Sequence, residues 1–261
     1  MAEEFIVDLP IGGSDVRQIS IGNSQSSGRR PYQEDSFGYT RLDQADIIRD
    51  GFIAVVSDGM GGLAAGDKVS AYSVAAMQQM RAHSSDAQPV HVRFTQMINA
   101  ISDQVYQSGT GGGATLVAVY CTTGGIYWCT TGDSRIYLYR NGRIHQLNRD
   151  FDYMEQLLDR VLDGGLTFAQ ADGDPKRDSL AEYVGSGEQI HPDVNIKPFI
   201  PETGDKLLLC TDGVYNAVSP EELSAELTKP AQPCADGITA AVLGKQYENQ
   251  DNLTSVVLEF R

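Results

Sequence analysis

The chain has 261 residues, of which 41% are hydrophobic and 21% charged, enough for one large domain or two small ones. Its net charge of -15 argues against nucleic-acid binding, because nucleic-acid-binding proteins usually present a basic face to the phosphates. No run of 18 apolar residues is present, which argues against a membrane span. Residues 1–4 are largely acidic and no apolar stretch follows them, so we expect no secretory signal and a cytoplasmic location.

Short apolar runs rich in β-branched residues recur along the chain, and their length and composition are typical of strands. These runs are residues 53–56, 115–120, 126–129, 136–139, 206–210 and 253–258. Gly124-Gly125 and Asn141-Gly142 lie beside such runs and favour tight hairpin turns. Hairpins predict antiparallel pairing.

Helical periodicity appears between these runs. Apolar side chains repeat at helical spacing within residues 65–80 and 94–105, and again around residues 235–242. Ser219 and Pro220, with Glu222 three residues after the serine, match the start of a capped helix. Hairpins combined with separate groups of helices favour two sheets packed on each other with helices outside, rather than an alternating βαβ sheet.

Residues 152–185 form a polar, helical excursion between strands. An amphipathic helix around 154–162 would end at Gly164-Gly165, and Thr167 can cap a short second helix. Such an insertion could be a mobile flap over a site, or a structural excursion without function. We expect one domain over residues 1–261, with a flap subdomain at about 152–185.

Acidic residues fall where the expected strands begin or end. Five such clusters are Glu34-Asp35, Asp58, Asp133, Asp212 and Asp251. Strand ends are rigid and can aim side chains at one point, and a glycine beside an aspartate lets the backbone come close and a carbonyl act as a ligand. Carboxylates that converge without lysine partners repel one another unless cations lie between them, and all-oxygen ligands select Mg²⁺ or Mn²⁺ over zinc. The sequence therefore predicts a centre that binds several metal ions.

At these residues the chain resembles the metal-dependent protein phosphatases, the type-2C serine/threonine phosphatases, in their bacterial form. The matching motifs run in order through most of the chain: residues 28–35, 55–62, 113–116, 132–135, 174–185, 204–209, 211–213 and 251–254. The resemblance implies an α+β fold, a four-layer α-β-β-α sandwich of two antiparallel sheets packed face to face, with helices on both outer sides and a small helical flap.

The resemblance also implies the ligands of two cations, Mn²⁺ or Mg²⁺. Asp58 would bridge the two ions, and Asp212 and Asp251 would hold the first. Glu34 and the carbonyl of Gly59 would serve the second, partly through water.

Further roles follow from the same resemblance. Asp35 would bond metal-bound water, and Asp133 with Asp212 matches the position of a third, weaker cation in bacterial members. Arg30 matches the phosphate-binding arginine. The implied reaction is direct attack of a metal-bridging water on phosphoserine or phosphothreonine, without a phosphoenzyme. The implied partner is a phosphorylated protein, a serine/threonine kinase or one of its targets; we expect a monomer that binds no nucleic acid or membrane.

The chain departs from the family pattern at a few positions. Met60 stands where many eukaryotic members have a histidine that is a proposed general acid, and a methionine cannot donate a proton. Ala114 replaces a common threonine, Glu182 a common arginine, and residues 147–152 differ from the usual Leu-Thr-x-Asp-His-Ser. These changes spare the expected metal ligands and bear on substrate preference.

Three other functions are weighed against this one. Cys129 and Arg135 fit the C-x₅-R spacing of cysteine phosphatases, but Arg135 runs into a strand rather than a helix, and Asp133 inside the loop would repel phosphate. The fold could also serve as a regulatory module without catalysis, or hydrolyse a small phosphorylated metabolite.

The remaining conspicuous residues favour structural roles. Cysteines 121, 129, 210 and 234 form no C-x-x-C pair, which indicates buried free thiols. Tyr32 and Phe37 are expected to pack against the core.

Overall fold

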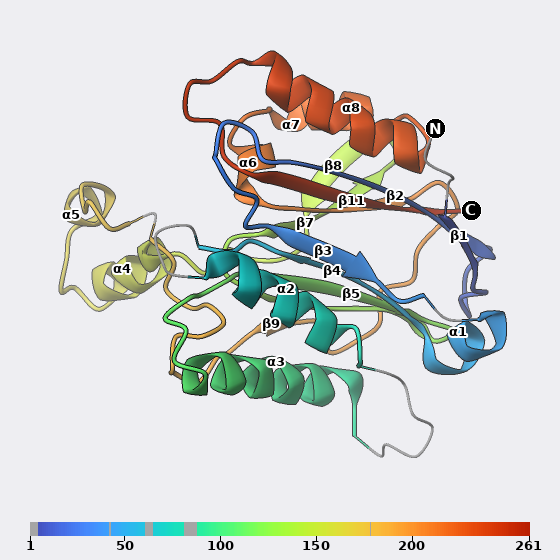
Figure 1. The fold of residues 1–261 in the computed structure, drawn as a ribbon, viewed down its shortest axis with the longest axis horizontal. Coiled ribbons are helices and arrows are strands. Elements are labelled where there is room, and N and C mark those ends of the chain that lie inside the picture. The colour runs from blue at the N-terminus through green and yellow to red at the C-terminus, as the bar shows by residue number, and fades with distance from the viewer. Residues whose placement is uncertain (1–4, 42, 61–64, 81–87, 178) are drawn as a thin grey trace.

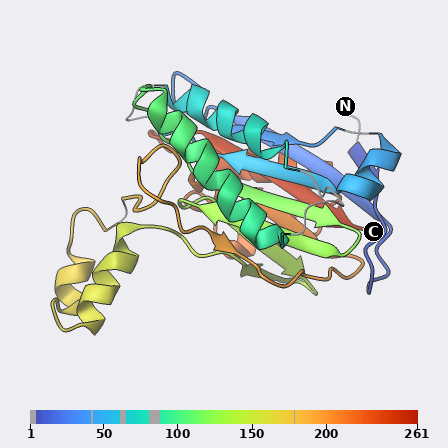
Figure 2. The ribbon, with the colours of Figure 1, turned by 90° about the horizontal axis from the view of Figure 1, so that it is seen from below.

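The computed structural model describes residues 5–41, 43–60, 65–80, 88–177 and 179–261. Two antiparallel sheets lie face to face and helices cover both outer sides, as Figure 1 and Figure 2 show. The expected four-layer sandwich is therefore confirmed. Gly61 and Gly62 of the glycine-rich motif, and residues 1–4, lie outside the described residues.

One sheet has six strands among the described residues, in the order β1-β2-β11-β10-β7-β8. Their bounds are β1 Phe5–Asp8, β2 Gln18–Ser26, β7 Arg135–Arg140, β8 Arg143–Gln146, β10 Lys206–Cys210 and β11 Leu253–Phe260. The expected hairpin joins β7 to β8, and both turn residues adopt positive φ, 52° at Asn141 and 77° at Gly142. Positive φ at two central residues is the geometry that Asn-Gly turns favour.

The other sheet has five strands among the described residues, in the order β3-β4-β5-β6-β9. Their bounds are β3 Ser36–Tyr39, β4 Phe52–Ser57, β5 Leu116–Thr122, β6 Gly125–Thr131 and β9 Asp193–Val194. The second expected hairpin joins β5 to β6.

Helices on the outer faces form where the apolar periodicity predicts them. The five-stranded sheet is covered by α2 (Gly66–Met77) and α3 (Val90–Gln107), and the six-stranded sheet by α7 (Pro220–Glu226) and α8 (Ala231–Gly244). Ser219 and Glu222 form the expected capping box at the start of α7. The periodicity in residues 65–80 overestimated the length of α2, which ends at Met77. Two shorter helices are α1 (Gln44–Asp50) and the four-residue α6 (Asp212–Tyr215).

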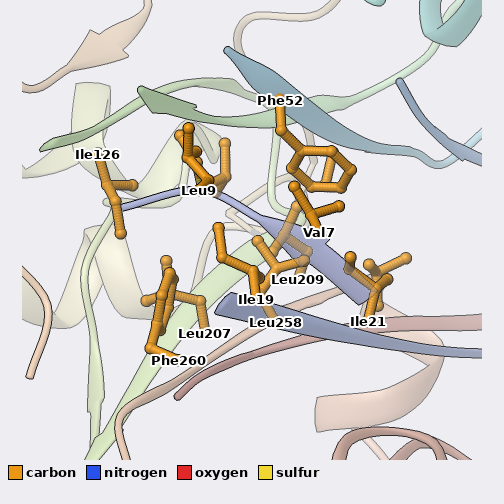
Figure 3. Packing of buried hydrophobic residues seen from close by; sticks show 14 of the residues in the cluster. Val7, Leu9, Ile19, Ile21, Phe52, Ile126, Leu207, Leu209, Leu258 and Phe260 are labelled. Carbon is orange, nitrogen blue, oxygen red and sulfur yellow. The ribbon is translucent and has the colours of Figure 1, made fainter. Parts of the chain in front are cut away.

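The main core fills the space between the two sheets (Figure 3). Ile19, Ile21, Leu207 and Leu258 from the six-stranded sheet meet Phe52 from the five-stranded one, and each is at most 1% exposed. Phe37 packs against this cluster as expected, whereas Tyr32 is 76% exposed, so the expectation that it packs was wrong. All four cysteines are buried and free, as predicted.

The excursion between β8 and β9 contains α4 (Tyr153–Leu162) and α5 (Phe168–Asp172), which project from one end of the sandwich (Figures 1 and 2). Asp152 pairs with Leu180 in an isolated bridge that closes the base of the excursion. The Phe151 N–H donates to the carbonyl of Gly132, 3.0 Å away. The base therefore lies next to the loop that carries Asp133.

Within the described part of the chain, no helix is both long and apolar enough to cross a bilayer.

Candidate metal centre

The strand register gathers the expected acidic residues at one end of the sandwich. Ser36 pairs with Ser57, which places Asp35 beside Asp58. Cys210 pairs with both Arg135 and Ser255, which brings the segments around Asp133, Asp212 and Asp251 to the same end of the other sheet. Side chains from five separated segments therefore meet there because the chain enters or leaves the sheets at that end.

Asp58 lies at the centre of this cluster. Its backbone N–H donates to the Thr115 hydroxyl at 3.0 Å, and its carbonyl accepts from the Thr115 N–H at 2.9 Å. Burial raises the pKa of Asp58 well above its ordinary value, and the negative charges of Asp35, Asp212, Asp133 and Asp251 raise it further. All four of these neighbours are expected site residues.

Asp35 is 4% exposed, and only one of its carboxylate oxygens is hydrogen-bonded among the described residues. Its Oδ2 accepts from the hydroxyls of Thr211 at 2.9 Å and Thr254 at 2.8 Å, while its Oδ1 is buried without a partner. Burial raises its pKa to about 7, although the two threonine bonds oppose this shift. A buried carboxylate oxygen without a donor fits a site where a cation or its bound water supplies the missing contact.

Asp133 and Asp212 experience the same combination of burial and like charge. Burial, followed by the charge of Asp212, raises the pKa of Asp133 to about 7. Burial and the charge of Asp251 raise the pKa of Asp212. Like charges that are held together in a buried site are stabilised when cations neutralise them.

Glu34 and Gly59 are held together at the edge of the cluster. The Gly59 N–H donates to the Glu34 carbonyl at 3.2 Å. A Cβ atom at Gly59 would lie 2.4 Å from the Gly66 carbonyl oxygen and 2.5 Å from that of Glu34, so no larger residue fits without a shift of the backbone. Burial, then the charge of Asp67, raises the pKa of the Glu34 carboxyl.

Arg30 reaches the cluster from an exposed position. Its Nη2 donates to Asp251 Oδ2 at 2.8 Å, and the two side chains are 50% and 41% exposed. This accessible guanidinium is therefore fixed at the rim of the acidic site, where a ligand can reach it.

The described carboxylates do not form a complete coordination shell as they stand. Among the described residues, no group of three or more His, Cys, Asp or Glu side chains is arranged so that it could hold a metal ion. The carboxylates nevertheless lie close enough to raise one another's pKa, and Asp35 leaves a buried oxygen without a donor. The donor set, which is all oxygen, fits hard divalent cations.

An open pocket of about 380 Å³ adjoins the cluster on the side of Asp212 and Asp251. Its lining continues through Asn216 on one side and through residues 247–250 on the other. Solvent and ligands can therefore reach these two carboxylates from outside.

The alternative cysteine-based site is excluded by the surroundings of Cys129 and Arg135. Cys129 is fully buried, and burial raises the pKa of its thiol far above the range in which a thiolate forms. Arg135 starts strand β7 and binds both oxygens of Asp150, so its guanidinium is already occupied.

Sequence reasoning missed the hydroxyl and amide groups that orient the carboxylates. Thr115, Thr211 and Thr254 bond Asp58 or Asp35, and Asn252 binds the loop that carries Arg30 and Glu34. Thr211 directly precedes Asp212, and Asn252 directly follows Asp251. Thr115 lies just before β5, and Thr254 lies at the start of β11. These positions next to acidic residues and strand ends were the signal available in the sequence.

Comparison with known proteins places the chain in a group of phosphatases. A family model described as protein phosphatase 2C matches residues 21–246. The "Serine/threonine phosphatase stp" of Listeria welshimeri is 28% identical over 217 residues, which cover 79% of this chain and 84% of that protein. The "Serine/threonine protein phosphatase PstP" of Mycobacterium tuberculosis is 30% identical over 234 residues, 85% of this chain but 43% of PstP.

Solved structures show the same fold. The serine/threonine phosphatase of S. agalactiae superposes with a TM-score of 0.75 at 23% identity, covering 93% of this chain and 100% of that one. The catalytic domain of PstP, solved in complex with two manganese ions, gives a TM-score of 0.69 at 25% identity, covering 93% of this chain and 98% of that one.

Proposed function

The chain belongs to the protein phosphatase 2C family and is a serine/threonine phosphatase, and we propose that it works through divalent cations held by the carboxylate cluster. One observation supports this most strongly. The buried carboxyl of Asp58 is surrounded by Asp35, Asp133, Asp212 and Asp251, and each raises its pKa. A cluster of this kind is costly to fold unless cations neutralise it.

We assign the ligands as the family resemblance implies. Asp58 would be shared by two cations, with Asp212 and Asp251 on the first and Glu34 and the Gly59 carbonyl on the second. As they stand, the described carboxylates do not form a closed ligand set.

Two further aspartates complete the assignment. Asp35 would orient water through its unpaired Oδ1, and Asp133 would join Asp212 at a third, weaker site. The bound cations would lower the pKa of a water molecule and offset the negative charge of the phosphate.

The protein's own side chains supply binding and orientation. Arg30 has a planar guanidinium that can bind two phosphate oxygens as a fork, and it lies half-exposed at the rim. Thr211 and Thr254 fix the Asp35 carboxylate, and Thr115 fixes the backbone at Asp58. Met60 has no proton to donate, so no side chain at that position acts as general acid.

The substrate is a phosphoprotein carrying phosphoserine or phosphothreonine. We propose Mn²⁺ or Mg²⁺ as the working ions, and a protein kinase or its targets as the substrate. A role for residues 152–185 as a flap of one single domain, a cytoplasmic location and a monomeric state stay predictions.

The proposal is tested by phosphate release from a phosphothreonine peptide. The purified chain should release phosphate with Mn²⁺ or Mg²⁺ and stop when EDTA removes the ions. A sugar phosphate and a nucleotide serve as comparison substrates, because faster turnover of either would indicate a metabolite phosphatase. Absence of release from every substrate with either ion would indicate a non-catalytic module and refute the proposal.

A further inference from the structure

A tyrosine hydroxyl links the two segments that carry Asp133 and Asp212. Helix α6 begins at Asp212 and ends at Tyr215. The Tyr215 hydroxyl donates to the backbone carbonyl of Asp133 at 2.9 Å. Asp133 lies between β6 and β7, whereas Asp212 directly follows β10, so this bond joins two segments about 80 residues apart in the chain.

The ring of Tyr215 is itself held in place. The guanidinium carbon of Arg135 lies 3.6 Å from the ring centroid, which is a close cation–π contact. Asp150 accepts from Arg135 Nε and Nη2, and Arg135 Nη1 donates to the Tyr137 hydroxyl at 2.9 Å. Because the guanidinium is fixed at three nitrogens, the ring beneath it has little freedom to move.

The backbone at Asp133 depends on such contacts. Gly132, immediately before it, has φ of 87°, a conformation that favours glycine and sharply redirects the chain. On the other side, the Ser134 hydroxyl lies 2.7 Å from that of Thr115, the residue that binds the backbone of Asp58. Asp133 therefore has one anchor toward Asp58 and a second, through Tyr215, toward Asp212.

We propose that Tyr215 is a positioning residue that holds Asp133 at a fixed place relative to Asp212 and thereby sets the affinity of the third cation site. The inference rests on the proposed function, which assigns these two aspartates to a cation. Groups that orient metal ligands through hydrogen bonds strongly affect metal affinity, although they do not touch the ion.

The test is calorimetric titration of Mn²⁺ into the metal-free full chain. Tyr215→Phe removes only the hydroxyl, so the weakest Mn²⁺ site should lose affinity roughly tenfold while the tighter sites are unchanged. Asp133→Asn should remove the same weak site and identifies it in the titration. Tyr139→Phe is the matched control, because it removes a tyrosine hydroxyl from β7 at the end of the strand away from Asp133, and all its sites should match wild type.

Three results would overturn the inference. The first is an unchanged Mn²⁺ affinity of the weakest site in Tyr215→Phe. The second is an equal loss of affinity at all sites, together with a lower unfolding temperature of the metal-free variant. The third is a wild-type protein that binds only two Mn²⁺ ions. The first result would mean that the Tyr215 hydroxyl has no role at the site, and the second that its role is only structural. The third would mean that the weak cation site does not exist. Failure of the proposed function is a separate result, since wild type would then release no phosphate whatever the titration of Tyr215→Phe shows.

Discussion

The side-chain oxygen of Asn252 accepts a hydrogen bond of 2.6 Å from the backbone N–H of Glu34, 218 positions earlier in the chain. The Asn252 amide nitrogen also donates to the carbonyls of Ser27 and Tyr32, at 3.1 and 3.0 Å. One amide thus fixes the whole loop between β2 and β3, which carries Arg30 and Glu34, beside Asp251.

Asn252→Ala should therefore damage catalysis without removing a metal ligand or a phosphate contact. The loop would lose three hydrogen bonds, so we expect kcat/KM to fall by roughly tenfold or more, since small displacements of catalytic groups are costly. The free energy of unfolding should fall by about 1–3 kcal/mol, because buried groups lose their partners. Steady-state kinetics and urea unfolding would measure both. Gln107→Ala, at an exposed amide side chain on α3, should change neither. A kcat/KM equal to wild type in Asn252→Ala would contradict the proposed role.

Arg30→Ala should chiefly weaken phosphate binding. A guanidinium that binds two phosphate oxygens contributes enough for KM to rise roughly tenfold or more when it is removed, with a smaller change in kcat. Arg30→Lys keeps the positive charge but loses the planar guanidinium that binds two oxygens, so its KM should lie between those of wild type and Arg30→Ala.

The neighbouring exposed Arg29 supplies the matched control for this measurement. Arg29→Ala removes the same charge from the same loop, so general electrostatic attraction would affect both variants equally. A rise in KM for Arg30→Ala alone supports a specific contact. An unchanged KM in Arg30→Ala, or equal effects in the two variants, would contradict it.

The stability of the metal-free chain should fall as pH rises. Asp35 and Asp133 have pKa values raised to about 7 in the folded chain, from an ordinary value of 3.8. A carboxyl whose pKa is higher in the folded state binds its proton more tightly there, so its stabilising contribution is complete below the ordinary pKa and is lost as pH rises through about 7. Cations replace those protons, so Mn²⁺ should stabilise the chain more at about pH 8 than at about pH 5.

Thermal unfolding in EDTA and in Mn²⁺ at these two pH values measures this effect. Asp133→Asn should reduce the pH dependence, because one of the carboxyls with a raised pKa is then absent. A metal-free chain that gains stability between the two pH values, with equal Mn²⁺ shifts at both, would show that the carboxylates are not forced together.

The parts of the fold that the sequence predicts are those with a strong local pattern. The apolar runs of β5, β6, β10 and β11 and the capping signal of α7 each contain enough local information to identify the element.

The strand β2, which lies between β1 and β11, escaped prediction for a physical reason. Only Ile19 and Ile21 are large and apolar, and the strand continues through glycine and polar residues. Its Gly22 is required by α8, since a Cβ there would lie 2.2 Å from the Ala231 carbonyl oxygen. Close helix packing therefore removed the apolar pattern by which strands are recognised.

The candidate site divides in the same way. Acidic residues at strand ends are visible in sequence, and the structure brings Asp35, Asp58, Asp133, Asp212 and Asp251 together. Their individual roles came from the family resemblance and stay proposals. The contacts that orient them, such as Tyr215 to the Asp133 carbonyl, join distant segments and leave no local pattern.

Hydrolysis by Asp58→Asn tests the central claim most directly, because every other proposed ligand is arranged around Asp58. Asparagine has nearly the same shape but no charge, so the variant should fold and should be at least as stable as wild type without metal. With saturating Mn²⁺ and a phosphothreonine peptide, we predict no release of phosphate above background. Release at the wild-type rate would contradict the account, since hydrolysis would then not depend on cations held at this carboxylate.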